Sequence, residues 1–311
     1  MSDRICAPCP SGEGSSECGG CLHGGSVDSQ GACVCPLGAW GGRCELTTLD
    51  LAVGSSYLCV LKSNGVVACW GDCWGPDAYA ISPAPGLYSA LAGERTSACG
   101  LKRDGTISCW GEKPVFAPPA EQFVSLSDRC ALKADGTALC WGTWCGQPPW
   151  NPSGTFQSFS STMDSYLEGA CGVRPDGTVE CAQRGDAFTA SEPVASPGGA
   201  FLSVSAGSEF CGVRRDLTVA CWARERGSQP VDVPQGTYVS VAAGQGYNCA
   251  IRTDGSPACW GSSSIQASLP SGAKLVSIFA GLGSACAIRT DGTFTCWGEW
   301  ADHLLGLITK D

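Results

Sequence analysis

The stretch that decides the fold reads Cys130-Ala-Leu-Lys-Ala-Asp-Gly-Thr-Ala-Leu-Cys140. Asp135-Gly136 stands at its midpoint, and a glycine in the left-handed conformation is typical of a three-residue hairpin loop. Folding the chain about this point places Cys130 directly opposite Cys140. Opposed residues of an antiparallel pair come close enough for a disulfide, particularly at a non-hydrogen-bonded position. The stretch therefore predicts a β-hairpin closed by its own disulfide.

The same Cys-x9-Cys spacing occurs seven times. Successive first cysteines lie 40, 31, 41, 40, 38 and 37 residues apart, a period typical of propellers and solenoids. One such pair can arise by chance, but seven identical spacings make the inference strong. The predicted disulfides join Cys59 to Cys69, Cys99 to Cys109, Cys130 to Cys140, Cys171 to Cys181, Cys211 to Cys221, Cys249 to Cys259, and Cys286 to Cys296.

Two further positions recur with each hairpin. A tryptophan follows the second cysteine in most repeats, and its fixed place predicts packing between neighbouring blades rather than ligand binding. A basic residue stands three positions after each first cysteine. A ring of ligand-binding cations is one interpretation, but we favour charges at the hairpin ends, near solvent, that reduce strand aggregation. These basic residues are Lys62, Lys102, Lys133, Arg174, Arg214, Arg252 and Arg289.

The composition excludes several classes of protein. The 311 residues carry 23 cysteines and a net charge of −10, which favours an oxidising compartment and argues against nucleic-acid binding. Two histidines leave little for imidazole catalysis. No run of 18 apolar residues is present, so we expect no membrane insertion. We expect a secreted or cell-surface protein whose export signal has been removed ahead of Met1, because no apolar stretch precedes the first cysteines.

Residues 50–311 resemble the β-propeller repeats of the regulator-of-chromosome-condensation type, in a disulfide-bearing form. The shared pattern is Val-Ser-x-Ala-Gly, then Cys-Ala-x-Arg/Lys-x-Asp-Gly-Thr, then Cys-Trp-Gly. The resemblance implies an all-β, seven-bladed propeller over residues 46–311, with four strands in each blade. We predict that 304–309 forms the last strand and closes the ring near 49–53. Four departures bear on local turn geometry: Ser63-Asn64-Gly65, Asp216-Leu217, Ala182 and Ala223.

Residues 1–45 form a predicted cysteine-rich module, too short for a core of its own. Residues 18–45 partly resemble an epidermal-growth-factor-like module, which implies the pairs Cys21–Cys33 and Cys35–Cys44. Cys6, Cys9 and Cys18 then lack a partner, so one of them is a candidate for an intermolecular disulfide. The Cys-x2-Cys spacing at 6–9 and 18–21 also suggests zinc, but the separation is short and the context oxidised, so we predict no metal.

The best interpretation of function is an extracellular binding protein that engages a macromolecular partner, in the first place a protein, through propeller-face loops. Alternatives are a lectin-like, carbohydrate-binding propeller and a structural surface or matrix component. No catalytic motif is evident, so we expect neither enzyme activity nor a cofactor. Cys73 and Cys145 are candidates for a disulfide across blade 2. The candidate ligand-binding residues are Tyr57, Trp74, Trp144, Trp150, Tyr166, Phe210, Tyr247 and Trp300.

Overall fold

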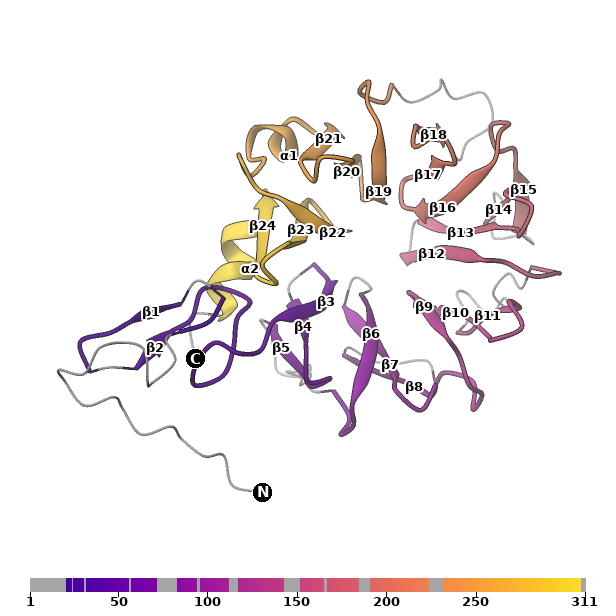
Figure 1. Ribbon diagram of the computed structural model, residues 1–311. Coiled ribbons are helices and arrows are strands. Elements are labelled where there is room, and N and C mark those ends of the chain that lie inside the picture. The colour runs from indigo at the N-terminus through magenta and orange to yellow at the C-terminus, as the bar shows by residue number, and fades with distance from the viewer. Residues whose placement is uncertain are drawn as a thin grey trace.

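Seven small antiparallel sheets are arranged in a ring, as the computed structural model shows (Figure 1). The model describes residues 21–308 except 24, 31, 56, 72–82, 94–95, 112–116, 143–151, 165–166, 185–190 and 224–231. The all-β propeller predicted from the sequence is thereby confirmed. An additional two-stranded hairpin, β1 (Ser26–Val27) with β2 (Cys33–Val34), precedes the ring.

The sheets are called blades 1 to 7 in chain order. Blade 1 contains β3 (Thr48–Val53), β4 (Tyr57–Lys62) and β5 (Val67–Gly71); blade 2 contains β6 (Tyr88–Gly93), β7 (Ser97–Lys102) and β8 (Ile107–Gly111); blade 3 contains β9 (Ser125–Ser127), β10 (Cys130–Leu132) and β11 (Ala138–Cys140). Blade 4 contains β12 (Ser158–Asp164), β13 (Leu167–Val173), β14 (Val179–Arg184) and β15 (Ser191–Val194). Blade 5 contains β16 (Phe201–Ala206), β17 (Glu209–Arg214) and β18 (Val219–Ala223); blade 6 contains β19 (Tyr238–Ala243), β20 (Tyr247–Arg252) and β21 (Pro257–Gly261); blade 7 contains β22 (Leu275–Ala280), β23 (Ser284–Arg289) and β24 (Phe294–Gly298).

The first strand of every blade lies at the centre of the ring (Figure 1). Each of these inner strands contacts the inner strand of the next blade, from β3 around to β22, and β22 contacts β3. The ring therefore closes between blades 7 and 1 through direct contact of the first and last repeats.

A recurring backbone hydrogen bond joins each blade to the next. The carbonyl of the hairpin-turn residue accepts from an amide at or just before the start of the following inner strand, as from Tyr238 to Leu217 at 2.7 Å. The same bond recurs at all seven seams, and Gly292 accepts from Thr48 at 2.9 Å to complete the circle. The turn chemistry seen in the sequence thus also holds neighbouring blades together.

Leu217 adopts the turn conformation that glycine supplies in the other blades, with φ +66°. A left-handed conformation is strained for leucine but not for glycine. Leu217→Gly is therefore expected to raise the free energy of unfolding by about 1 kcal/mol, measured by urea denaturation. The control is the reverse substitution, Gly255→Leu in blade 6, where φ is +84°. The same measurement should show a lower free energy of unfolding. Destabilisation by Leu217→Gly would contradict this account of the turn.

The hairpin disulfides form the core between blades. All seven predicted pairs are present, with Cα–Cα separations of 4.0 to 4.1 Å. Each recurring tryptophan packs against the cysteine face of the preceding blade, as Trp260 does against Cys211 and Cys221. Packing of these tryptophans between blades is therefore confirmed. In blade 4, where alanine replaces tryptophan, Phe156 and Phe159 fill the space against Cys130 and Cys140.

The row of basic residues packs against aromatic rings and carboxylates. The Arg174 guanidinium lies 5.3 Å from the Phe156 ring centroid, within the range of a cation–π contact. The same contact joins Lys102 to Tyr88, Arg214 to Phe201, and Arg252 to Tyr238. These side chains are partly buried, so they lie near solvent at the hairpin ends, as predicted, and also pack against neighbouring rings.

The last described residues are helical, which corrects the strand predicted over 304–309. Residues Ala301–Ile308 form α2, with Ala301 and Leu304 buried. Helix α2 packs on β24, β4 and β5, so it covers the seam between blades 7 and 1. In blade 6, the short helix α1 (Ser263–Ala267) follows β21 in place of the fourth strand, and its Ile265 is fully buried. Four strands per blade are therefore observed in blade 4 but not in blades 6 and 7.

The segment before the ring is attached to the same seam. It contains both disulfides implied by the module resemblance, Cys21–Cys33 and Cys35–Cys44. Trp40 stacks on Trp70 at 5.4 Å, and the Lys62 ammonium lies 4.5 Å from the Trp40 ring centroid. Blade 1 begins with Thr48 rather than an aromatic residue, so Trp40 supplies the ring that Lys62 would otherwise lack.

Candidate recognition surface

The ends of the inner strands and the residues that follow them converge on one face of the ring and surround a hollow of about 130 Å³. Every blade contributes, because each inner strand ends at this face. We call this surface the channel mouth. Its lining residues are Val53, Gly54, Gly93, Asp128, Ser161, Thr162, Ala206, Gly207, Ser208, Ala243, Gly244, Gln245, Ala280, Gly281 and Leu282.

Side-chain hydroxyls fix the inner strands beside the channel mouth. Ser205 Oγ accepts the Ala243 amide at 2.9 Å, and Ser160 Oγ accepts the Ala206 amide at 3.0 Å, each across a blade seam. Ser127 Oγ accepts the Ser161 amide in the same way. Inner strands are edge strands whose amides have no sheet partner, so these bonds satisfy them. The channel mouth is therefore a rigid rim of small side chains and backbone groups.

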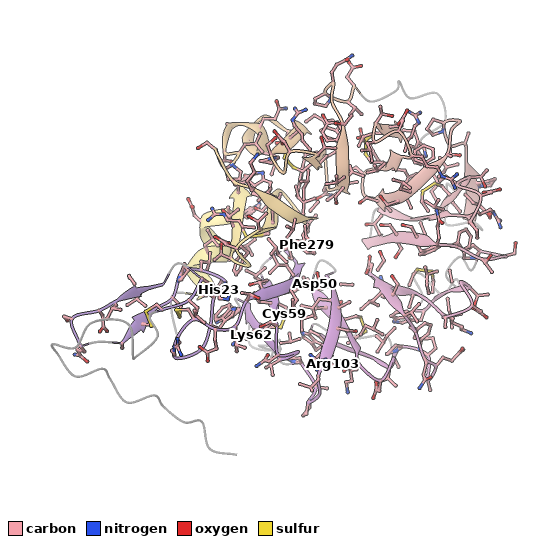
Figure 2. The ribbon with its side chains drawn as sticks, in the orientation of Figure 1. His23, Asp50, Cys59, Lys62, Arg103 and Phe279 are labelled. Carbon is pink, nitrogen blue, oxygen red and sulfur yellow. A yellow bond between two sulfur atoms is a disulfide. The ribbon has the colours of Figure 1, made fainter. Side chains whose placement is uncertain are left out.

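Asp50 performs this bridging role between blades 1 and 2. Its carboxylate accepts the amides of Leu51 at 2.9 Å and Leu91 at 2.8 Å. Figure 2 shows Asp50 at the inner edge of the ring, near Phe279. Burial raises the pKa of Asp50 from its ordinary value of 3.8 to about 6, although the two amide bonds act in the opposite direction.

Asp50→Asn is expected to remove a pH dependence of stability. The folded chain holds this proton up to about pH 6. An unfolded aspartate releases it near pH 4, so the free energy of unfolding falls as pH rises between these values, by at most about 3 kcal/mol. Denaturant unfolding at several pH values from 4.5 to 7 measures the slope. Asp254→Asn is the control, because hydrogen bonds from Ser256 lower the pKa of Asp254, and the slope should persist. An unchanged slope in Asp50→Asn would contradict the assignment.

Four of the eight candidate ligand-binding aromatic residues lie in the described part of the chain. For three of them the structure corrects the prediction of a surface position. Tyr57, Phe210 and Tyr247 are buried, with exposed fractions of 1% or less. Tyr247 donates from its hydroxyl to the Ser284 carbonyl at 2.7 Å, and burial raises the pKa of this phenol. These rings belong to the core between blades: Tyr57 and Tyr247 begin a second strand and face the following blade, whereas Phe210 is the second residue of β17 and faces the preceding blade.

Trp300 is the one described candidate that is exposed, at 49%. It is held beside the channel mouth, because its amide donates to Ser284 Oγ at 2.9 Å and its ring lies against Gly283, next to Leu282. The ring meets His303 edge-on, with centroids 6.4 Å apart. Trp74, Trp144, Trp150 and Tyr166 lie outside the described residues, as do Cys6, Cys9, Cys18, Cys73 and Cys145.

The small residues of the channel mouth were not among the predicted site residues. Three of the segments involved are Ala206-Gly207-Ser208, Ala243-Gly244-Gln245 and Ala280-Gly281-Leu282. The Ala-Gly pair recurs in the sequence, and the residue after each pair lies at the channel mouth in blades 5, 6 and 7. A Cβ on Gly93 would lie 2.8 Å from the Val53 backbone, so glycine at this point permits the close approach of neighbouring blades.

Within the part of the chain that the structure describes, no three His, Cys, Asp or Glu side chains are grouped as metal ligands. A search of the same residues finds no helix with the length and apolar character to cross a membrane.

Comparison with solved structures supports the propeller. The crystal structure of the CRINKLY WD40 ectodomain from the Arabidopsis thaliana receptor kinase ACR4 matches with a TM-score of 0.60 and 25% identity, covering 81% of this chain and 95% of that chain. The ectodomain of the Physcomitrella patens receptor kinase CR4 matches with a TM-score of 0.58 and 23% identity, covering 81% and 73%. No protein-family model and no curated protein matches the chain in sequence.

Proposed function

We propose that this protein is an extracellular recognition protein that engages a macromolecular partner, in the first place a protein, at the channel mouth. The observation that carries the proposal is the convergence of loops from all seven blades around one rigid hollow. A preformed rim loses little conformational entropy on binding, which favours affinity. Nine disulfides support an oxidising, extracellular setting. Both similar solved chains named above are receptor ectodomains.

The residue types at the rim favour a protein partner. Exposed Gln245 and half-buried Leu282 stand on neighbouring loops, with half-exposed Trp300 beside them. Tryptophan is enriched among residues that dominate protein–protein binding energy, and polar groups around it are typical of such interfaces.

Affinity capture from the native extracellular milieu tests the proposal. The full chain is compared with the double variant Gln245→Arg and Leu282→Arg, which changes the rim without touching the core. We expect one or more proteins to be retained by the unaltered chain and lost by the double variant. Val124→Asp, on the opposite end of the ring, is the matched control and should retain them. Equal capture by all three proteins would refute recognition at the channel mouth.

A carbohydrate partner is the second candidate, favoured by one observation. The exposed Trp300 ring beside the hollow can act as a stacking platform for a sugar. Glycan-array binding that disappears in Trp300→Ala would establish this alternative, whereas array binding by neither protein would exclude it.

A further inference from the structure

Six of the seven hairpin disulfides pack in one core cluster with a tryptophan of the following blade. In blade 5, for example, Cys211 and Cys221 share a cluster with Trp260 of blade 6. This tryptophan directly follows the second cysteine of its own hairpin, so the repeat itself brings an indole to the preceding disulfide. The other pairs are Trp70 with Cys286–Cys296, Trp110 with Cys59–Cys69, Trp141 with Cys99–Cys109, Trp222 with Cys171–Cys181, and Trp297 with Cys249–Cys259.

The seventh disulfide, Cys130–Cys140, packs against a different kind of ring. Ala182 stands in blade 4 at the position of the recurring tryptophan, and Phe156 and Phe159 share the cluster with the two cysteines instead. Phenylalanine does not absorb the near-ultraviolet light that excites tryptophan. The chain therefore holds two kinds of aromatic–disulfide contact at equivalent places in one repeat.

The tryptophan–disulfide pairs lie in the core between blades. Trp260 is 6% exposed, and Cys211 is fully buried. An excited indole readily gives up an electron, and a disulfide is the side-chain group that most readily accepts one. Because the two groups pack together without water between them, electron transfer to the disulfide competes with light emission by the indole.

We propose that these six tryptophans make the blade disulfides light-driven redox switches. The excited indole donates one electron to the antibonding S–S orbital and the S–S bond breaks, which leaves a thiolate, a thiyl radical and an indole radical cation. An external one-electron reductant of the ascorbate class returns one electron to the indole and gives one to the thiyl radical. The net products are an intact tryptophan and two thiolates, and the opened hairpin no longer links the two strands at the seam.

Irradiation of the full chain in the presence of ascorbate tests the proposal. The light is taken from the long-wavelength edge of the tryptophan band, where tyrosine does not absorb. Thiols are then alkylated in denaturant and located by peptide mapping, because the thiolate is the reactive form of cysteine. We expect light-dependent labels at the six bridges that face tryptophan, and the fewest labels at Cys130–Cys140. Equal labelling of all seven bridges, or labels that do not depend on light, would overturn the proposal.

Trp260→Phe isolates one pair. It keeps an aromatic ring at the seam but removes the absorbing indole, so labels at Cys211 and Cys221 should fall to the level of the dark sample. The bridge beside Trp297 should still be labelled in the same molecule. Trp300→Phe is the matched control, because this tryptophan is 49% exposed and all labels should remain. Persistent light-dependent labelling of Cys211 and Cys221 in Trp260→Phe would contradict transfer from the neighbouring indole.

A gain of sensitivity provides a second test that does not depend on the folding of Trp260→Phe. Ala182→Trp with Phe159→Ala places an indole at the recurring position of blade 4 and makes room for it beside Cys130–Cys140. Labelling of this bridge should then rise to the level of the other six, with Phe159→Ala alone as the control. Circular dichroism before irradiation confirms that each variant is folded. A double variant that folds but leaves this bridge unlabelled would overturn the proposal, whatever the channel mouth binds.

Discussion

Trp297→Ala is expected to lower the free energy of unfolding by about 3–5 kcal/mol. Trp297 is 3% exposed and packs in one cluster with Cys249, Cys259 and Ile265 of blade 6. Truncation removes a large ring from the seam between blades 6 and 7. The strand backbones on either side are held in their sheets, so they cannot move in to fill the cavity. Weakening one seam destabilises both adjoining blades, because each repeat is stabilised by its neighbours. Denaturant unfolding followed by tryptophan fluorescence and circular dichroism measures the change.

Trp300→Ala is the matched comparison. It removes the same side chain three residues later, where the ring is 49% exposed. The expected change in stability is within about 0.5 kcal/mol. Similar losses for both variants would contradict the assignment of Trp297 to the core and Trp300 to the surface.

Removal of a single blade disulfide has the second large expected effect. Cys59→Ala with Cys69→Ala opens blade 1, where the cysteines pack with Tyr88 and Trp110 of blade 2. Restoring chain entropy to the unfolded state lowers stability by about 3 kcal/mol, and the lost sulfur packing adds to this. Thermal unfolding under non-reducing conditions measures the decrease.

The matched control removes the disulfide Cys21–Cys33 instead. Its sequence separation is 12 residues against 10 for Cys59–Cys69, so the loop entropies are similar. The bridge holds the β1–β2 hairpin, whose Val27 is 61% exposed. The main unfolding transition of the ring should therefore remain in place. A fall equal to that of the blade 1 variant would show that the hairpin is part of the same cooperative core.

Local repetition made most of the fold predictable. The Cys-x9-Cys spacing requires Cys130 to oppose Cys140, and the structure pairs them in register. The turn at Asp216-Leu217 lacks glycine, yet the hydrogen bond to the next blade needs the same backbone geometry there. The requirements of the repeat therefore override the local preference of leucine.

The end of the chain shows where the repeat misled the prediction. The spacing of Ala301, Leu304, Leu305 and Ile308 follows a helical period, and this signal was available in the sequence. The expectation of a fourth strand in each blade led to a predicted strand here instead of a helix. Helix α2 covers the closing seam instead of extending the sheet.

The candidate site was less predictable, because exposure depends on contacts between repeats. Tyr247 and Trp300 both stand near loops, yet one faces the neighbouring blade and the other faces solvent. A single repeat does not reveal which side of a strand meets the next blade. The small residues of the channel mouth were missed for the related reason that they contribute through convergence rather than through distinctive side chains.

Each blade of the propeller is closed by its own disulfide, which suits the protein to oxidising surroundings. Peptide mapping of the unreduced protein with free-thiol labelling tests these pairings. Among the described residues we expect nine linked pairs: Cys21–Cys33, Cys35–Cys44 and the seven hairpin bridges from Cys59–Cys69 to Cys286–Cys296. A free thiol, or a link between different blades, at any of the fourteen hairpin cysteines would contradict these pairings.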